Sequence, residues 1–193
     1  MNVDTYWIEK LTPLIERDQV IQDVLMGKGV LEDTYHPDLE KAQLLNAQKL
    51  KRMIETKGFP VLSNAGEKGV HLSWLIIQHA ISLPDFMRES LIQIRLAVSQ
   101  EDYPKELLAY TEDKICFLEG RRQLFGTNLE WEEGELKATP IEDPKFVDER
   151  RKAFGLPPIA EVLLQVTHTK PPKDPVKKAL ELKLWLLKVG WRV

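Results

Sequence analysis

The chain has 193 residues, of which 43% are hydrophobic and 30% charged, and this composition is typical of globular proteins rather than of disordered or collagen-like ones. Its formal net charge is -3, whereas nucleic-acid-binding proteins normally show a dominant basic surface, so we expect no nucleic-acid partner. Cys116 is the one cysteine, which excludes an internal disulfide and a cysteine-based zinc site, and the first residues lack the basic and apolar regions of a signal peptide. We therefore expect a cytoplasmic protein.

Apolar residues recur at steps of three or four through the first 57 residues, which predicts helices. Two helical stretches are expected over 3–15 and 20–25, with Thr12-Pro13 between them as an N-cap and first helical position. A further helix opens at His36-Pro37-Asp38 and ends at Lys57-Gly58. Residues 59–62 are then predicted to be extended, and residues 63–69 to form a loop.

The stretch 72–81 is apolar nearly all round, so as a helix it has no solvent face and belongs in the centre of the fold. It is too short to span a bilayer. Two more amphipathic helices follow, one from Pro84 to Val98 and one from Pro104 to Glu119, and Gly120 ends the second.

The last third of the chain carries the only strand signal. Residues 127–131 and 136–139 flank a connection of four residues that contains glycine, which predicts a β-hairpin. A short charged helix from Asp143, a helical turn or two after Pro157-Pro158, and a last helix over 176–189 complete the chain. The predicted fold is mainly α, a compact multi-helix domain over residues 1–168 with a small β-hairpin insertion and a proline-linked basic helix over 169–193.

The C-terminal segment differs in charge from the rest of the chain. Residues 169–193 hold seven Lys or Arg and two Asp or Glu, a net of +5, which leaves -8 on the remaining residues. A basic amphipathic helix over 176–189 can pack on the acidic body of its own chain, on a second copy, on another protein or on an anionic membrane. A membrane is the least expected of these, because the apolar face is short.

Gln78 and His79 place two polar side chains within the apolar helix, where each needs a hydrogen-bond partner. His79 is a candidate general base or ligand-orienting group, because histidine titrates near neutral pH. The alternative is a core histidine satisfied by a carbonyl or a carboxylate. The four histidines have no metal-ligand spacing, and no glycine-rich phosphate motif occurs, so we expect neither a metal nor a nucleotide cofactor.

A second polar cluster covers residues 121–128, between a helix end and the hairpin. Arg121 and Arg122 suit an anionic group of a ligand. The alternative is that they neutralise the helix C-terminus while Gln123 and Thr127 satisfy loop backbone. Asp113, on the preceding helix, can pair with Arg122 or orient His79, and spacing does not decide which.

These clusters resemble those of a bacterial domain-of-unknown-function family. Its motifs are D-Q, G-W-P, W-x-x-x-Q-H-A-D, G-R-x-Q-x-Y-G-T-Q and E-D-P-x-x-V-D-x-R-R, followed by G-L-P-P. The similarity runs in order over roughly residues 5–165, and the matching stretches here are Asp18-Gln19, Gly58-Phe59-Pro60, Trp74 with Gln78-His79-Ala80, Gly120-Arg121 with Gln123, Phe125-Gly126-Thr127-Asn128, Glu142-Asp143-Pro144 with Val147-Asp148 and Arg150-Arg151, and Gly155-Leu156-Pro157-Pro158.

Four positions depart from the family pattern. Ile81 stands where the family has an acid, Phe59 replaces a tryptophan, Phe125 replaces a tyrosine, and Asn128 replaces a glutamine. If the acid and the tyrosine were an acid/base pair in the family, this chain has lost both. The resemblance implies an ordered set of polar motifs and supplies no substrate.

The leading hypothesis is a polar pocket that binds, and in an enzyme would hydrolyse or transfer, a small polar or anionic ligand. His79 would be the base, Gln78 and Gln123 would orient the ligand, and an arginine would attract its charge. The candidate residues are Gln78, His79, Gln123 and Thr127, joined by Arg121, Arg122, Asp18, Gln19 and Asp113. The alternative is a non-enzymatic interaction or regulatory module that engages a partner through the C-terminal helix.

Overall fold

The computed structural model describes residues 5–29, 36–132, 135–165 and 174–192, and it confirms a mainly α fold with one small antiparallel hairpin. The chain forms two compact units, residues 1–103 and 104–193. The expected boundary between residues 168 and 169 lies outside the described residues, and the C-terminal helix belongs to the second unit. Within the described ranges, none of the helices has the length and apolar content that crossing a bilayer requires.

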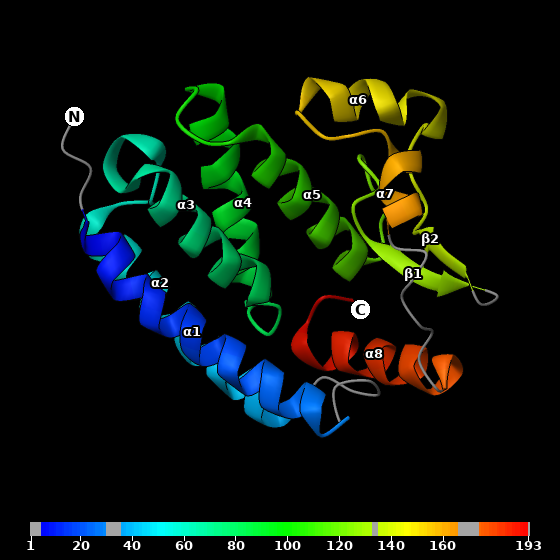
Figure 1. Cartoon of the computed structure of the whole chain (residues 1–193), viewed down its shortest axis with the longest axis horizontal. Coiled ribbons are helices and arrows are strands. Elements are labelled where there is room, and N and C mark those ends of the chain that lie inside the picture. The colour runs from blue at the N-terminus through cyan, green and yellow to red at the C-terminus, as the bar shows by residue number, and fades with distance from the viewer. Residues whose placement is uncertain (1–4, 30–35, 133–134, 166–173, 193) are drawn as a thin grey trace. The chain divides into compact units, whose positions relative to one another are not determined.

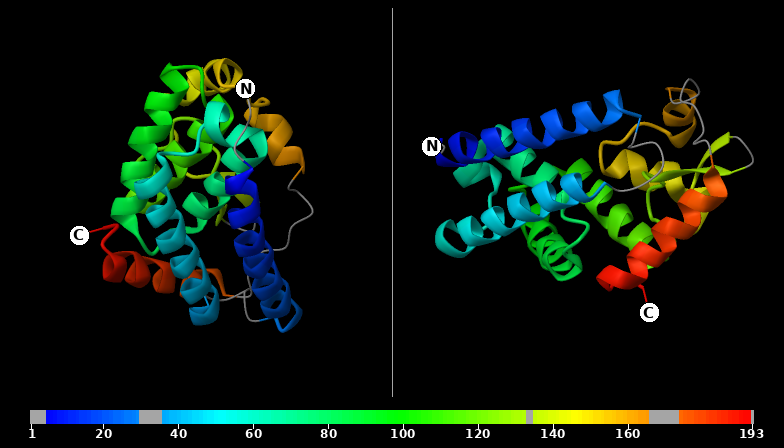
Figure 2. Two further views of the ribbon diagram at one scale, coloured as in Figure 1. Left: turned by 90° about the vertical axis from the view of Figure 1, so that its left-hand side faces the viewer. Right: turned by 90° about the horizontal axis from the view of Figure 1, so that it is seen from below.

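The described part of the first unit contains α1 (Tyr6–Gly27), α2 (Pro37–Lys57), α3 (Leu62–His79) and α4 (Pro84–Ser99). Helices α1 and α2 run antiparallel and side by side, as Figure 1 and both views of Figure 2 show. Helix α3 contacts α1, α2 and α4. Four of residues 72–81 are buried and the other six are partly buried, so this stretch packs inside its unit but keeps a partly exposed side, which was not predicted. Its helix ends at His79.

The predicted break at Thr12-Pro13 is wrong, because α1 continues through Pro13. A proline inside a helix removes one backbone hydrogen bond, and here the hydroxyl of Thr12 donates to the Ile8 carbonyl at 2.7 Å on the same turn. The buried positions Trp7, Leu11, Asp18 and Leu25 lie on both sides of the proline. The stabilisation from packing these buried residues along one face of α1 therefore exceeds the cost of the proline inside the helix.

The loop predicted over residues 63–69 is also wrong, since α3 already begins at Leu62. Asn64 accepts a hydrogen bond from the Val61 amide at 2.9 Å and donates to the Phe59 carbonyl at 3.0 Å, which fixes the start of the helix. Gly66 has φ of +65° and ψ of 174°, so it makes a kink inside α3 that a residue with a side chain adopts only with strain. The glycine marks a kinked helix, and not a loop.

The second unit contains α5 (Lys105–Glu119), β1 (Leu129–Glu132), β2 (Glu135–Ala138), the 3-10 turn η1 (Pro144–Phe146), α6 (Val147–Ala153), α7 (Ile159–Gln165) and α8 (Pro175–Val189). Strands β1 and β2 pair antiparallel with Leu129 opposite Ala138. The strands, α5 and α8 all lie within one or two residues of their predicted ranges. Gly120, with φ of +74°, ends α5 as expected.

Helix α8 is apolar on two sides. Leu186 is buried, and Arg192 after the helix donates to the carbonyls of Phe117 and Leu118 at the end of α5, at 2.8 and 3.0 Å. The other side carries four exposed apolar residues at helical spacing, which are Val176, Leu180, Leu184 and Leu187. We call these four residues the α8 stripe. Its contact with a second copy or another partner stays a prediction.

Candidate functional site

A buried aspartate and a partly exposed histidine meet in the first unit. Asp18, in the middle of α1, is 2% exposed, and its Oδ2 lies 2.6 Å from Nδ1 of His79, the last residue of α3. The other carboxylate oxygen, Oδ1, accepts a hydrogen bond from Nε2 of Gln43 on α2 at 3.3 Å. Three helices thus position one carboxylate against one imidazole.

The exposure of the two side chains is unequal, and this decides what the pair can do. The His79 side chain is 33% exposed, whereas that of Asp18 is 3% exposed. Of the two neutral tautomers of the imidazole, the carboxylate that faces Nδ1 favours the one that carries its proton on Nδ1. In that tautomer Nε2 is the proton acceptor. A buried carboxylate that orients an imidazole in this way is the arrangement used by histidine general bases.

Two further polar side chains lie close to His79 in the sequence, Gln78 and Ser82. Gln78 is half-buried. Three residues after His79, the hydroxyl of Ser82 donates to the Glu40 carboxylate of α2 at 2.8 Å. Gln19, by contrast, is exposed and donates along α1 to Asp23 at 2.8 Å, so it lies on the outer side of the helix.

Asp113 serves a different structure in the second unit. It is fully buried on α5, and its carboxylate accepts hydrogen bonds from the backbone amides of Leu124, Phe125 and Thr127 at 2.7 to 3.2 Å. The Thr127 hydroxyl donates to the same carboxylate at 3.1 Å. Asp18, and not Asp113, faces Nδ1 of His79. The polar atoms of Asp113 are directed at the loop that follows α5.

The carbonyl side of the same loop is held by two arginines of α6. Nε of Arg150 donates to the Leu124 carbonyl at 2.7 Å, and Nη1 of the buried Arg151 donates to the Phe125 carbonyl at 2.7 Å. Burial lowers the pKa of the Arg151 guanidinium. Gly126 has φ of +67°, and a Cβ there would lie 2.7 Å from side-chain atoms of Ile141 and Ile159. We call residues 124–127, with these partners, the clamped loop.

Gln123 precedes the clamped loop and is completely buried. Its Oε1 accepts from the Asn128 amide at 2.7 Å, while its Nε2 donates to the carbonyls of Asn128 and Thr139 and contacts the Thr139 hydroxyl. Its backbone bridges to Ile141. This side chain ties the end of the loop to the hairpin, so its polar atoms are occupied within the protein.

Arg121 and Arg122 line a cavity of about 400 Å³ in the second unit. Arg121 pairs with Glu119 at 2.7 Å and is half exposed. Burial raises the pKa of the Glu130 carboxyl, and the nearby Arg192 guanidinium partly offsets that rise. The cavity is lined by Phe117, Gly120, Arg121, Arg122, Glu130, Thr139, Pro140 and Arg192.

The candidate residues therefore form separate groups. Asp18, Gln78 and His79 belong to the first unit, and Asp113, Gln123 and Thr127 belong to the second. A single pocket made of both groups stays a prediction. Across the described residues, no three His, Cys, Asp or Glu side chains gather as metal ligands would.

Sequence reasoning missed two kinds of residue. Gln43 supports Asp18, and no local pattern points to it because the two residues lie 25 positions apart. Arg150 and Arg151 hold the clamped loop, and the sequence identified them only as part of a family motif, without a role. The second kind is a charged residue placed in apolar surroundings, Lys114, for which burial lowers the pKa of the ammonium group. Its spacing of three and four from the buried Thr111 and Leu118 was the available signal. Cys116 is buried as predicted, and burial raises the pKa of its thiol to about 11.

Comparison with known proteins assigns the chain to a family, and that family has no known activity. Residues 8–170 match a family of unknown function (DUF6624), which covers most of the chain, including both aspartates and the clamped loop. No curated protein and no solved structure matches the chain.

Proposed function

We propose that this chain, which belongs to the DUF6624 family of unknown function, binds a small polar ligand at His79 and uses that residue to accept a proton from it. The observation that carries the proposal is the 2.6 Å contact between Nδ1 of His79 and the buried Asp18 carboxylate. It leaves Nε2 of a side chain that is 33% exposed as the proton acceptor.

The reaction class that fits is hydrolysis or group transfer. Such a step needs a base that removes a proton from water or from a ligand hydroxyl, and a histidine held in one tautomer supplies it. Asp18 is the positioning residue, because it acts through the imidazole. Gln78, adjacent in sequence and half-buried, is the candidate for orienting the ligand.

The test compares His79→Gln with His71→Gln in the full chain, using p-nitrophenyl acetate and p-nitrophenyl phosphate as probes of ester hydrolysis. Glutamine at position 79 keeps a donor for Asp18, so we expect a nearly unchanged melting temperature and loss of probe hydrolysis. His71 is exposed, and its ring lies against that of Trp74 with centroids 5.5 Å apart and planes inclined by 36°, so its variant should behave like the parent. Equal hydrolysis by the parent and His79→Gln would contradict the proposal, as would a collapse in stability without any hydrolysis by the parent.

A second candidate function is anion binding in the arginine-lined cavity of the second unit. Three guanidinium groups and one carboxylate line about 400 Å³, and arginine pairs well with phosphate and carboxylate. Calorimetry with inorganic phosphate, against chloride at equal ionic strength, tests it. We expect Arg122→Gln to weaken phosphate binding and the exposed Lys152→Gln to leave it unchanged. If both variants weakened phosphate binding equally, the binding would depend on the net charge of the protein and not on this cavity, which would contradict the second candidate function.

A further inference from the structure

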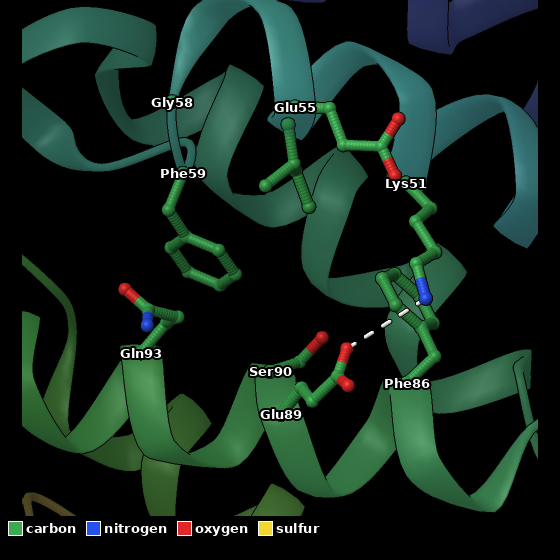
Figure 3. A pocket seen from close by; sticks show the side chains of 9 residues that line it. Lys51, Glu55, Gly58, Phe59, Phe86, Glu89, Ser90 and Gln93 are labelled. Atoms are coloured by element: carbon green, nitrogen blue, oxygen red, sulfur yellow. Dashed lines mark ion pairs between the residues drawn. The ribbon is translucent and has the colours of Figure 1, made fainter.

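The first unit contains a cavity of about 600 Å³ between α2, the turn after it and α4. This volume lies within the range of small-molecule sites. Figure 3 shows Phe59 entering it from the turn, with Ser90 opposite on α4 and Gln93 one turn further along that helix. The lining residues are Lys51, Ile54, Glu55, Gly58, Phe59, Phe86, Glu89, Ser90 and Gln93. His79 and Asp18 are not among them.

The inner part of the cavity is apolar except for one buried serine. Phe86, which is 5% exposed, forms an aromatic and aliphatic lining with Phe59 and Ile54. Ser90, which is 2% exposed, places its hydroxyl in this lining. At the rim, the exposed Gln93 adds an amide that can both donate and accept a hydrogen bond. An apolar lining with a few convergent polar groups is the usual composition of a small-molecule site.

The turn that carries Phe59 is held in place by a hydrogen bond to its backbone and by a ring contact. Gly58, with φ of +80°, ends α2 and turns the chain, and the Asn64 side chain holds the Phe59 carbonyl at 3.0 Å. The Phe59 ring lies 6.3 Å from the ring of the buried Tyr103. Because backbone and ring are both held, the face that Phe59 offers to a ligand is fixed before the ligand arrives.

The charges at the rim favour a cation. Lys51 and Glu89 pair at 3.8 Å and largely cancel, which leaves the carboxylate of Glu55 in excess. The C-terminal end of α2, at Lys57 and Gly58, adds the negative partial charge of its last carbonyls. The nearby Lys57 ammonium is directed at the Tyr6 ring, 4.9 Å from its centroid, and does not line the cavity. Aromatic faces attract cations as well.

We infer that this cavity binds a small organic ammonium compound, with its apolar or aromatic body between Phe59 and Phe86 and its ammonium group toward Glu55 and Glu89. The inference does not depend on the proposed role of His79, because the two sites share no residue. Lys51 would lower the affinity for the ligand, since its own ammonium group competes with that of the ligand for the same carboxylates.

The probe is phenethylamine, which is an ammonium ion at neutral pH, titrated into the full chain and followed by backbone amide NMR shifts of Phe59, Ser90 and Gln93. We expect saturable shifts with a Kd on the order of 1 mM, the range that a ligand of this size allows. The neutral 2-phenylethanol should bind about fivefold more weakly, and the anionic 3-phenylpropanoate more weakly still, because the rim charge is negative.

Two rim variants with opposite expected effects separate this site from unspecific binding. Glu55→Gln should weaken phenethylamine binding about fivefold, whereas Lys51→Gln should tighten it about threefold. Both side chains are exposed, so neither change threatens folding. Glu67→Gln and Lys49→Gln are the matched controls, exposed on α3 and α2 outside the cavity, and they should leave the Kd unchanged.

Several results would overturn the inference. These are an absence of saturable shifts at Phe59, Ser90 and Gln93, equal affinity for phenethylamine and 2-phenylethanol, or changes in the same direction for Glu55→Gln and Lys51→Gln. A change in the controls as large as in the rim variants would also overturn it.

Discussion

Two buried aspartates in this chain have opposite surroundings. Asp113 is 0% exposed, and its carboxylate accepts hydrogen bonds from three backbone amides and one hydroxyl of the clamped loop. Asp18 is 2% exposed; one of its carboxylate oxygens accepts from the Gln43 side-chain amide, and the other contacts the imidazole of His79. Burial of a carboxylate alone does not indicate chemistry; the identity of its donors does. Backbone donors make a structural anchor, whereas a partly exposed imidazole makes a candidate base.

The comparison predicts its largest effect for Asp113→Asn. The amide nitrogen would face donors of the clamped loop, and several charge-assisted hydrogen bonds would be lost, so we expect the free energy of unfolding to fall by about 3 kcal/mol or more. Urea unfolding measures the loss, and hydrogen exchange at the Phe125 and Thr127 amides localises it. Native exchange rates at these two amides in the variant would show that Asp113 does not hold the loop.

Gln123→Ala tests the same loop without touching a charge. It leaves the Asn128 amide and the Thr139 hydroxyl without their partner in the core and creates a small cavity, so we expect a loss of about 2 kcal/mol. The exposed Gln19→Ala is the matched control and should change the free energy of unfolding by less than about 0.5 kcal/mol. Equal losses from the two glutamines would contradict the structural role of Gln123.

Asp18→Asn should cost less, about 1 kcal/mol, because asparagine can keep one hydrogen bond to Gln43 or to His79. Its main consequence is on the imidazole, which loses the acceptor that fixes its tautomer. Hydrolysis of the p-nitrophenyl probes should therefore drop more than stability does. A variant that loses stability but retains full hydrolysis would place Asp18 with Asp113 as a structural anchor.

The smallest effect on stability is expected for Leu184→Glu in the α8 stripe. Leu184 is 58% exposed, so the free energy of unfolding should change by less than about 0.5 kcal/mol, as measured by urea unfolding. Leu186→Glu, at the buried position two residues on, is the matched comparison and should be strongly destabilising. A large loss from Leu184→Glu would mean that this face of α8 is covered in solution.

Helical periodicity and glycine stops were enough to predict most elements, because those signals are local. The errors lie at Pro13, where α1 continues through a local stop signal, and around Gly66, where a kink interrupts α3 without ending it. At Pro13 the helix gains more from its buried residues than the proline costs. At Gly66 the backbone does leave the helical conformation, but for one residue only, and the helix continues beyond the kink.

The candidate site was predictable only in part. The polar pair in the apolar stretch identified His79, and its need for a partner was evident, but the partner was not, because Asp18 lies 61 positions away. Spacing left Asp113 free to pair with Arg122 or His79, and the structure directs its carboxylate to the clamped loop. Pairings over such distances depend on how helices pack, which periodicity does not specify.

The most direct test of the Asp18–His79 pair is the nitrogen-15 NMR spectrum of the His79 side chain in the parent chain and in Asp18→Asn. The parent should show, in the neutral imidazole, a protonated Nδ1 and an unprotonated Nε2, and the variant should show a mixture of the two tautomers. A proton on Nε2 in the neutral ring of the parent, or the same tautomer ratio in both proteins, would contradict the assignment of Nε2 as the proton acceptor.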